Sequence, residues 1–354
     1  MTTSGTYAGG GIMTTFVGTG EKGFSGDGGP ADKAKLDNPF DLGFDSLGNL
    51  FFSDTQNHRI RRVDAKTRNI TTVVGTGEKT FSGDGGPADK ASLWEPYGLT
   101  LDRANNIYIV DRFNFRIRRV DAKTGMISTI AGTGEKAHSG DGGPALNAAL
   151  LEPNDIAFSP DERFLYIADP SDHRVRAVDM QNGIINTFAG TGAEKDFGDG
   201  GPAAKAGVWG ARAVTVGTDG TVYIAQKQGS MLRAVDPLGT IRHFAGTGEY
   251  GYAGDGGPME KAVFDKPKEL CMDGEGAILV VDTEVPVIRR IDIKNNIVTT
   301  IAGVGDRKHY YTGDGISATS TSLARPHGIT VGSDGAIYIG DSENHRIRKV
   351  MRAA

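Results

Sequence analysis

The hexapeptide Gly26-Asp27-Gly28-Gly29-Pro30-Ala31 decides how the chain folds, because it returns five more times along the sequence. Three of the later copies are identical, and the last two are looser versions, GDGGPM and GDGISA. The aspartates that mark the six copies are Asp27, Asp84, Asp141, Asp199, Asp255 and Asp314. So regular a spacing, 56 to 59 residues, indicates six structural units of one kind.

Four short apolar or alternating runs lie between one copy and the next. In the first unit they are residues 40–44, 49–53, 58–63 and 70–74, which are rich in β-branched and aromatic residues and bounded by turn residues. No run is long enough for a helix. Four strands joined by tight turns are typical of a propeller blade, so the six units predict an all-β, six-bladed β-propeller of four-stranded blades.

The two ends of the sequence predict how the ring closes. Residues 12–17 copy the stretch that ends each later unit, although no unit precedes them, and the last unit stops at Val350 without that stretch. We therefore expect the N-terminal strand to supply the outer strand of the last blade, so that no free sheet edge remains. Residues 1–11 are small, polar and Gly-rich and are predicted to be a flexible tail, which leaves residues 12–354 as one propeller domain.

Composition restricts the class of partner and the compartment. The 39 Lys+Arg and 44 Asp+Glu residues give a formal net charge of -5, which argues against a nucleic acid or an anionic membrane as partner. The single cysteine, Cys271, excludes an internal disulfide framework. No stretch approaches the ~18 apolar residues of a membrane span, and the first residues lack a signal-peptide pattern. These features predict a cytoplasmic protein, unless a leader peptide has been removed.

The strands of each unit carry a recurring pattern of residues. The last unit has Pro326-His327-Gly328-Ile329, then Asp341, then Asn344-His345-Arg346-Ile347-Arg348, and the other units repeat this order with variations. Over residues 12–351 the pattern resembles NHL repeats. The resemblance implies a propeller fold but no single chemistry, because the family includes scaffolds, RNA binders and lyases.

In a chain of repeats, residues shared by all units are expected to serve the fold. The hexapeptide belongs to this class: its glycines allow positive φ, and its aspartate is expected to cap its own backbone in an Asx turn. A phosphate nest or a calcium loop is the alternative, but each copy carries only one carboxylate.

Charged residues near the end of each second strand also repeat. An acid stands there in five units, an arginine follows seven residues later in all six, and a second arginine follows at five residues in four units. The fourth unit loses the acid (Gln226) and the nearer arginine (Met231) together. We therefore expect charge-assisted pairs between these two positions, such as Asp54 with Arg59, rather than a basic surface for nucleic acid.

One position in the blade differs in every unit and is the candidate for function. It begins the innermost strand, at the mouth of the central channel, where propellers bind ligands. Glu269 lies directly behind this ring, and Trp94 and Trp209 lie just ahead of it in two units. The six ring residues are Phe40, Tyr97, Asn154, Arg212, Lys268 and His327.

The chemistry of the ring favours an enzyme that acts on a small anionic substrate, as a lyase or hydrolase. Arg212 and Lys268 are expected to hold a carboxylate or phosphate, His327 to accept a proton, and Tyr97 to donate one. The remaining predicted substrate contacts are Asn154, Phe40, Trp94, Trp209 and Glu269.

Two other interpretations of the ring remain open. Its side chains could plug the channel and satisfy one another through Asp41, Asp155 and Glu269. The protein could also be a non-catalytic scaffold whose mouth loops bind a protein or peptide.

Histidine and oxygen-bearing residues near the channel mouth are the candidates for a metal site. In the peptide-amidating lyase that this fold resembles, histidines at the inner-strand starts hold zinc, and only His327 matches such a position here, which argues against zinc. The lactonase-like propellers hold calcium in the channel through oxygen ligands. Asn154, Asp155, Asp41 and Glu269 form the comparable set for calcium.

Overall fold

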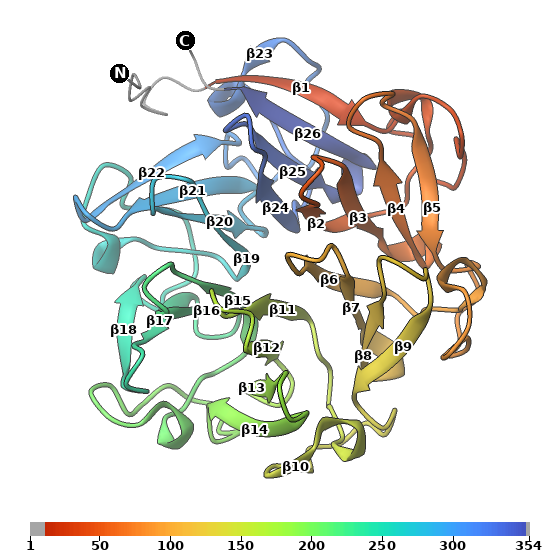
Figure 1. Ribbon diagram of the computed structural model, residues 1–354. Coiled ribbons are helices and arrows are strands. Elements are labelled where there is room, and N and C mark those ends of the chain that lie inside the picture. The colour runs from red at the N-terminus through yellow and green to blue at the C-terminus, as the bar shows by residue number, and fades with distance from the viewer. Residues whose placement is uncertain (1–10, 352–354) are drawn as a thin grey trace.

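The computed structural model describes residues 11–351 and shows six antiparallel sheets arranged in a ring around a central channel (Figure 1). Each sheet is one blade, with its first strand nearest the channel, so the predicted fold is confirmed. The first three blades, from the channel outward, are β2 (Pro39–Phe44), β3 (Leu50–Asp54), β4 (Arg59–Val63) and β5 (Ile70–Val74); β6 (Pro96–Leu101), β7 (Ile107–Asp111), β8 (Arg116–Val120) and β9 (Ile127–Ala131); and β11 (Asp155–Phe158), β12 (Phe164–Asp169), β13 (Arg174–Asp179) and β14 (Ile184–Ala189) with β10 (Gly143–Pro144) at the edge.

The remaining three blades complete the ring. They are β15 (Ala211–Val216), β16 (Val222–Gln226), β17 (Met231–Val235) and β18 (Ile241–Ala245); β19 (Pro267–Met272), β20 (Ile278–Asp282), β21 (Val287–Asp292) and β22 (Ile297–Ala302); and β24 (Gly328–Val331), β25 (Ile337–Asp341), β26 (Arg346–Met351) and β1 (Ile12–Val17) with β23 (Ile316–Ser317) at the edge.

Helical structure in residues 11–351 is limited to single 3-10 turns, as the absence of long periodic runs predicted. No helix in this part of the chain is long and apolar enough to span a bilayer. The 3-10 turns are η1 (Ala31–Lys33), η2 (Thr55–Asn57), η3 (Ala88–Lys90), η4 (Arg112–Asn114), η5 (Ala145–Asn147), η6 (Ala203–Lys205), η7 (Met259–Lys261), η8 (Ala318–Ser320) and η9 (Ser342–Asn344).

The last blade closes the ring with strands from both ends of the chain. β1 pairs antiparallel with β26, from Ile12 opposite Met351 to Val17 opposite Ile347, as predicted. The predicted tail lies outside the described residues except for Gly11, whose carbonyl accepts a hydrogen bond from the Ala318 N–H at 2.7 Å. The last sheet therefore has its outer strand, and no blade is left incomplete.

The hydrophobic core is divided into layers between neighbouring blades. One buried cluster lies between each pair of adjacent blades, including the last and the first, where Phe52 and Leu50 share a cluster with Tyr338 and Ile347. The seam at which the ring closes is thus packed like the other five interfaces. Burial of these side chains, at ~25 cal/mol per Å² of apolar surface, is the main force holding blade to blade.

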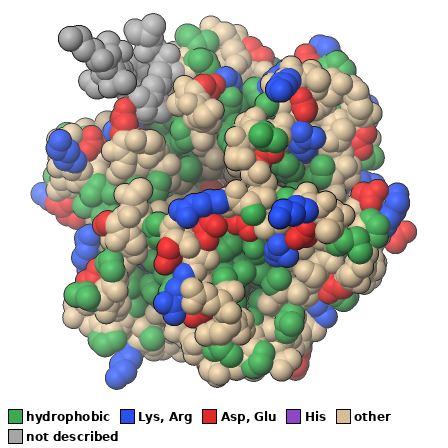
Figure 2. Space-filling view, viewed as in Figure 1, with side chains coloured by type: hydrophobic (Ala, Val, Ile, Leu, Met, Phe, Trp, Pro, Cys, Tyr) green, Lys and Arg blue, Asp and Glu red, His purple; other side chains and the backbone are tan. Residues whose placement is uncertain are grey.

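The face of the ring viewed in Figure 2 carries Lys and Arg side chains interspersed with Asp and Glu. This mixture differs from the continuous basic stripe of a nucleic-acid-binding surface.

A buried arginine joins each hexapeptide to its blade. The arginines are Arg61, Arg118, Arg176, Arg233, Arg289 and Arg348, and each is at most 1% exposed. Each contacts the hexapeptide aspartate of its own unit at 2.6 to 3.0 Å. In the described residues none of these aspartates accepts a backbone N–H, so the expected Asx turn is wrong. The aspartate instead supplies the counter-charge for the arginine.

In the first, second and last blades, the acid that ends the second strand pairs with this same arginine rather than with the nearer one. Arg61 Nη1 lies 3.1 Å from Asp54 Oδ2, and its Nη2 lies 2.9 Å from Asp27 Oδ1. Arg59 instead donates to the carbonyl of Asn57 and stacks on an aromatic ring of the loop. The predicted Asp54–Arg59 pair is therefore wrong, because the more deeply buried guanidinium lies beneath the hexapeptide and reaches both carboxylates.

Candidate functional site

The six ring residues meet at one end of the channel. Phe40, Tyr97, Asn154, Arg212, Lys268 and His327 all line a cavity of about 360 Å³. The β3–β4 turns and their equivalents in other blades add residues that the sequence analysis missed. These further lining residues include Gln56, Arg112, Ser171, Lys227, Gln228 and Glu343. Their signal in the sequence was their place one or two residues after the acid of each blade, where the residue type also varies between units.

Arg212, the second residue of β15, is the cavity's unusual cation. Its side chain is 5% exposed, yet in residues 11–351 it has no hydrogen bond or ion pair, and its guanidinium lies 5.4 Å from the centre of the Tyr97 ring. The guanidinium borders the cavity, where its N–H donors remain available. The side chain therefore offers a fork of donors to whatever enters the cavity.

Lys268, the other predicted anion contact, already has a partner. Its Nζ lies 2.9 Å from Glu284 Oε1, and the side chain is 6% exposed. Burial lowers the pKa of Lys268 to about 8, although Glu284 acts in the opposite direction. Lys268 is thus neutralised within its own blade, which weakens its predicted role as half of an anion clamp.

His327 is held as a neutral imidazole. Its Nδ1–H donates to the carbonyl of Arg325 at 2.8 Å, and the ring stacks on Phe40 with the centroids 4.0 Å apart. Burial lowers the pKa of His327 well below its usual value, and the cations Lys268 and Arg212 lower it further. With Nδ1 protonated, Nε2 carries the free lone pair and can accept a proton or a hydrogen bond.

Tyr97 and Asn154 lie on the opposite side of the ring from Lys268. The Tyr97 hydroxyl accepts a hydrogen bond from Arg112 Nη1 at 2.7 Å, and burial raises the pKa of Tyr97, so the phenol stays protonated at neutral pH. Asn154 Nδ2 donates to the Glu152 carbonyl at 2.7 Å. Tyr97 can therefore still donate its proton, as predicted for it.

The two tryptophans are not part of the cavity wall. Trp94 is 38% exposed and packs on Phe113, with the ring centroids 5.5 Å apart. The backbone N–H of Trp209 donates to Asp196 at 3.0 Å. Neither indole lines the cavity, which corrects their placement beside a ligand. Residues just ahead of an inner strand belong to loops whose direction the repeat does not determine.

Below the ring lies a layer of three buried acids, Asp41, Asp155 and Glu269, whose oxygen atoms come within 4.8 Å of one another. Asp41 accepts the N–H groups of Leu42 and Leu99, both at 2.7 Å. Burial, with the repulsion of Asp155, raises the pKa of Asp41 to about 8. The pKa of Asp155 is likewise raised, to about 6, and that of Glu269 well above its usual value, mainly by burial.

This acidic layer does not fit the calcium set expected from the sequence. Calcium needs six to eight oxygen ligands in a site that can hold it. The space between the ring and the acids has a water-accessible volume of about 0 Å³, and Asp41 and Asp155 already accept two backbone N–H groups each. The acids fill the channel below the ring, whereas the mouth above them, which the plug interpretation expected the ring side chains to fill, contains the cavity.

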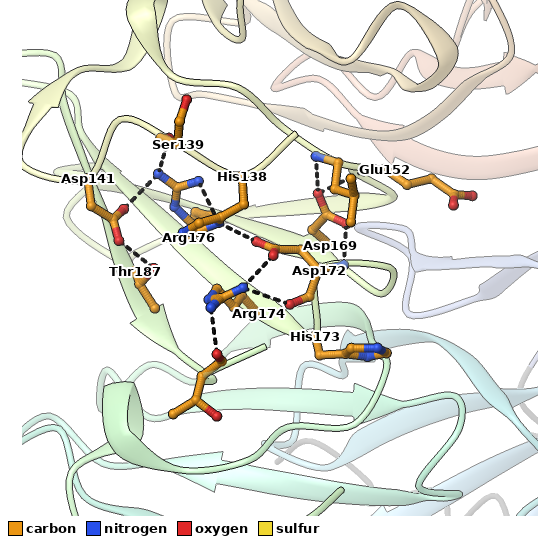
Figure 3. A network of polar contacts seen from close by, with 12 residues as sticks. His138, Ser139, Asp141, Glu152, Asp169, Asp172, His173, Arg174, Arg176 and Thr187 are labelled. Carbon is orange, nitrogen blue, oxygen red and sulfur yellow. Dashed lines mark hydrogen bonds and ion pairs between the residues drawn. The ribbon is translucent and has the colours of Figure 1, made fainter. Parts of the chain in front are cut away.

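A second polar cluster lies within the third blade (Figure 3). His138 stands where the other units carry an aromatic ring, and its Nδ1 lies 2.6 Å from Asp172 Oδ2. Asp172 also pairs with Arg174, while Arg176 contacts His138 instead of Asp169. The cluster replaces the repeat's own charge network and does not add a wall to the cavity.

Two parts of the chain match family models. Residues 323–350 match the NHL repeat, and residues 66–136 match the Teneurin NHL domain. The chain is 27% identical over 323 residues to Protein SUPPRESSOR OF QUENCHING 1, chloroplastic, from Arabidopsis thaliana, covering 88% of this chain and 30% of that protein. It is 27% identical over 329 residues to NHL repeat-containing protein 2 from Bos taurus, covering 84% and 44%. The chain thus spans less than half the length of these relatives.

A solved structure has the same architecture. An auxiliary nutrient binding protein from Bacteroides thetaiotaomicron superposes with a TM-score of 0.69, covering 96% of this chain and 76% of that one, at 19% identity. At this identity the likeness concerns the fold alone.

Proposed function

Because the chain is a six-bladed β-propeller built from NHL repeats, we propose that it binds a small organic anion at the channel mouth and acts on it as a lyase or hydrolase. The observation that carries the proposal is the buried guanidinium of Arg212, which faces the cavity without a partner in residues 11–351. The charge of Arg212 lowers the pKa of the three acids beneath it, but burial still raises the pKa of Asp41 to about 8, so that this acid is mostly neutral at pH 7, whereas Asp155, with a pKa of about 6, is mostly charged.

His327 supplies the proton acceptor in this proposal. Its neutral state and its fixed Nδ1–H leave Nε2 as a base at the edge of the cavity. In an elimination, Nε2 takes the proton from the carbon next to the anionic group, and the electron pair left behind forms the double bond as the leaving group departs. In a hydrolysis it takes a proton from the attacking water. Tyr97, which stays protonated, can donate a proton to the leaving oxygen.

A panel of small carboxylates and phosphates, screened by thermal shift, provides the ligand with which to test the site. Arg212→Ala is expected to weaken binding by about 1.5 to 3 kcal/mol, roughly ten- to a hundredfold, because it removes a charge-assisted contact. His327→Ala is expected to abolish turnover and leave affinity nearly unchanged. Calorimetry measures the affinity, and NMR of the mixture measures product.

The control is Arg242→Ala, which removes an exposed arginine on β18 of the same blade as Arg212. It should change neither binding nor turnover. If every compound that binds the wild-type protein binds Arg212→Ala with the same affinity, the proposal of an anion site at Arg212 is wrong. Such a result, together with capture of a peptide by the mouth loops, would favour the non-catalytic scaffold.

A further inference from the structure

In the fourth blade, the turn after the second strand has lost the charged pattern that the first, second, third and last blades keep and of which the fifth blade keeps only the acid. Its sequence from 226 to 231, QKQGSM, lacks the acid, the histidine and the nearer arginine of the repeat. Asp196, from the preceding loop, takes over the missing acid's contacts: its Oδ1 accepts the Trp209 N–H at 3.0 Å and a short hydrogen bond from Gln226 Nε2. A residue outside the turn thus makes the contacts that stabilise the blade here, so the turn residues themselves do not have to make them.

Lys227, the first residue of this turn, lines the cavity beside Arg212. It is half-buried, and in the described part of the chain its Nζ has no hydrogen bond or ion pair. Burial lowers the pKa of Lys227, and the charge of Arg212 is the next largest cause, so the two cations are close enough to repel each other. Glu152 and Glu284 act on Lys227 in the opposite direction but form no contact with it.

The other cations of the cavity wall differ in being paired. Arg112 contacts Glu95 and Glu152, Lys268 contacts Glu284, and Arg325 contacts Glu284 and Glu343. Two positive charges without a partner therefore remain on the wall in residues 11–351, and both belong to the fourth blade: Arg212 from β15 and Lys227 from the turn after β16.

We infer that the anionic group of the ligand is a dianion of the phosphate-monoester class, held between Arg212 and Lys227. This inference rests on the proposed anion site and specifies its ligand. A carboxylate has two acceptor oxygens, which the guanidinium fork of Arg212 can occupy together, so that none is left for Lys227. A phosphate monoester carries about -1.5 to -2 at pH 7 and has three acceptor oxygens, enough for the guanidinium fork and the ammonium together.

The rest of the ligand would lie against the other side of the ring. Phe40 stacks on His327 and lies 4.7 Å from Tyr97, between ring centroids, so this side of the cavity is aromatic. Flat or apolar groups pack well on such a surface. A matched pair of probes follows from this arrangement: phenyl phosphate, a dianion, and benzoate, a monoanion with the same ring.

The test is calorimetric titration of both probes into the wild-type protein, Lys227→Gln, Lys227→Met and Arg212→Ala at pH 7.5. Either Lys227 variant should weaken phenyl phosphate about tenfold or more and benzoate by less than about threefold, whereas Arg212→Ala should weaken both. Lys66→Gln, which removes an exposed lysine from the β4–β5 turn, is the charge control and should change neither.

The outcomes separate this inference from the function on which it rests. Equal losses for the two probes in the Lys227 variants, or no saturable binding of phenyl phosphate to the wild-type protein, would overturn the dianionic class. If Arg212→Ala still weakened benzoate, the anion site itself would stand. If Arg212→Ala changed the affinity for neither probe, the dianionic class and the proposed anion site would both be overturned.

Discussion

Single residues in this protein are best understood by comparison with their counterparts in the other blades. In the second blade Asn114 Nδ2 donates to Asp111 at 2.9 Å, whereas the third blade has Asp172 at this position. A carboxylate cannot donate, and the pKa of Asp169 is raised to about 7 by burial, with Asp172 adding to the rise. His138 contacts the carboxylate of Asp172. The third blade therefore differs from the second at both of these positions, and the two side chains that differ contact each other.

A double-mutant cycle tests this coupling. His138→Phe with Asp172→Asn recreates the second-blade arrangement, while either change alone alters only one side of the His138–Asp172 contact. We expect the double variant to be more stable than the sum of the single effects by about 1 kcal/mol or more, measured by urea unfolding at pH 7. Effects that add within about 0.5 kcal/mol would show the two residues to be independent.

Residue positions could be predicted from the sequence, but residue partners could not. The period of the repeat determines which side chain begins each inner strand, and for this reason all six ring positions meet at one cavity. The partner of Lys268 is Glu284, from the turn between β20 and β21, and no spacing indicates that this turn bends toward the channel. For the same reason, the sequence did not indicate that Lys227 lines the cavity.

At the scale of elements, the strands were predictable and the loop pairings were not. The four strands of the first blade begin and end within one residue of the predicted bounds. β10 and β23 were not predicted, because Gly- and Pro-rich segments argue against strands. They pair with the outer strands β14 and β1, and single bridges such as Pro30 to Asn69 repeat the contact elsewhere. The hexapeptide is thus a short extra edge on each blade.

The closing strand β1 permits a test by deletion. Removing residues 1–18 should lower the melting temperature sharply, because it exposes the edge of β26 and removes the fully buried side chains of Met13 and Val17. Removing residues 1–10 leaves β1 whole and should have little effect. Differential scanning fluorimetry compares the two, and equal melting of the longer deletion and the full chain would contradict the closure.

At the scale of the whole molecule, the channel has an alternating lining. The acids of the first, third and fifth blades face Gly98, Ala213 and Gly328 of the others. A Cβ added at Gly98 would lie 2.8 Å from the Asp155 Cα, so the channel is too narrow for six large side chains. Two of the acids also bind the next blade: Asp41 accepts the Leu99 N–H and Asp155 accepts the Val214 N–H, both at 2.7 Å.

This layer predicts how stability depends on pH. Burial raises the folded-state pKa of the acids, so the folded protein holds more protons than the unfolded chain between about pH 4 and pH 8, and stability is lost as pH rises through this window. Glu269→Gln keeps the shape and an amide donor, and should therefore flatten the decline in melting temperature from pH 5 to pH 8. Glu135→Gln, at an exposed glutamate, should not. Identical slopes for the wild type and Glu269→Gln would contradict the prediction.

The pairing of β1 with β26 also determines how the ring responds to mechanical tension. Ile12 is the sheet partner of Met351 on one side and of Ser317 on the other, so a force that pulls the two ends apart acts first on these contacts and then on those of the next residues. The hydrogen bonds between the strands then break one after another. If the strands were instead pulled lengthwise past each other, all the bonds would carry the force together. We therefore expect tension along the chain to open this propeller first at the seam between β1 and β26.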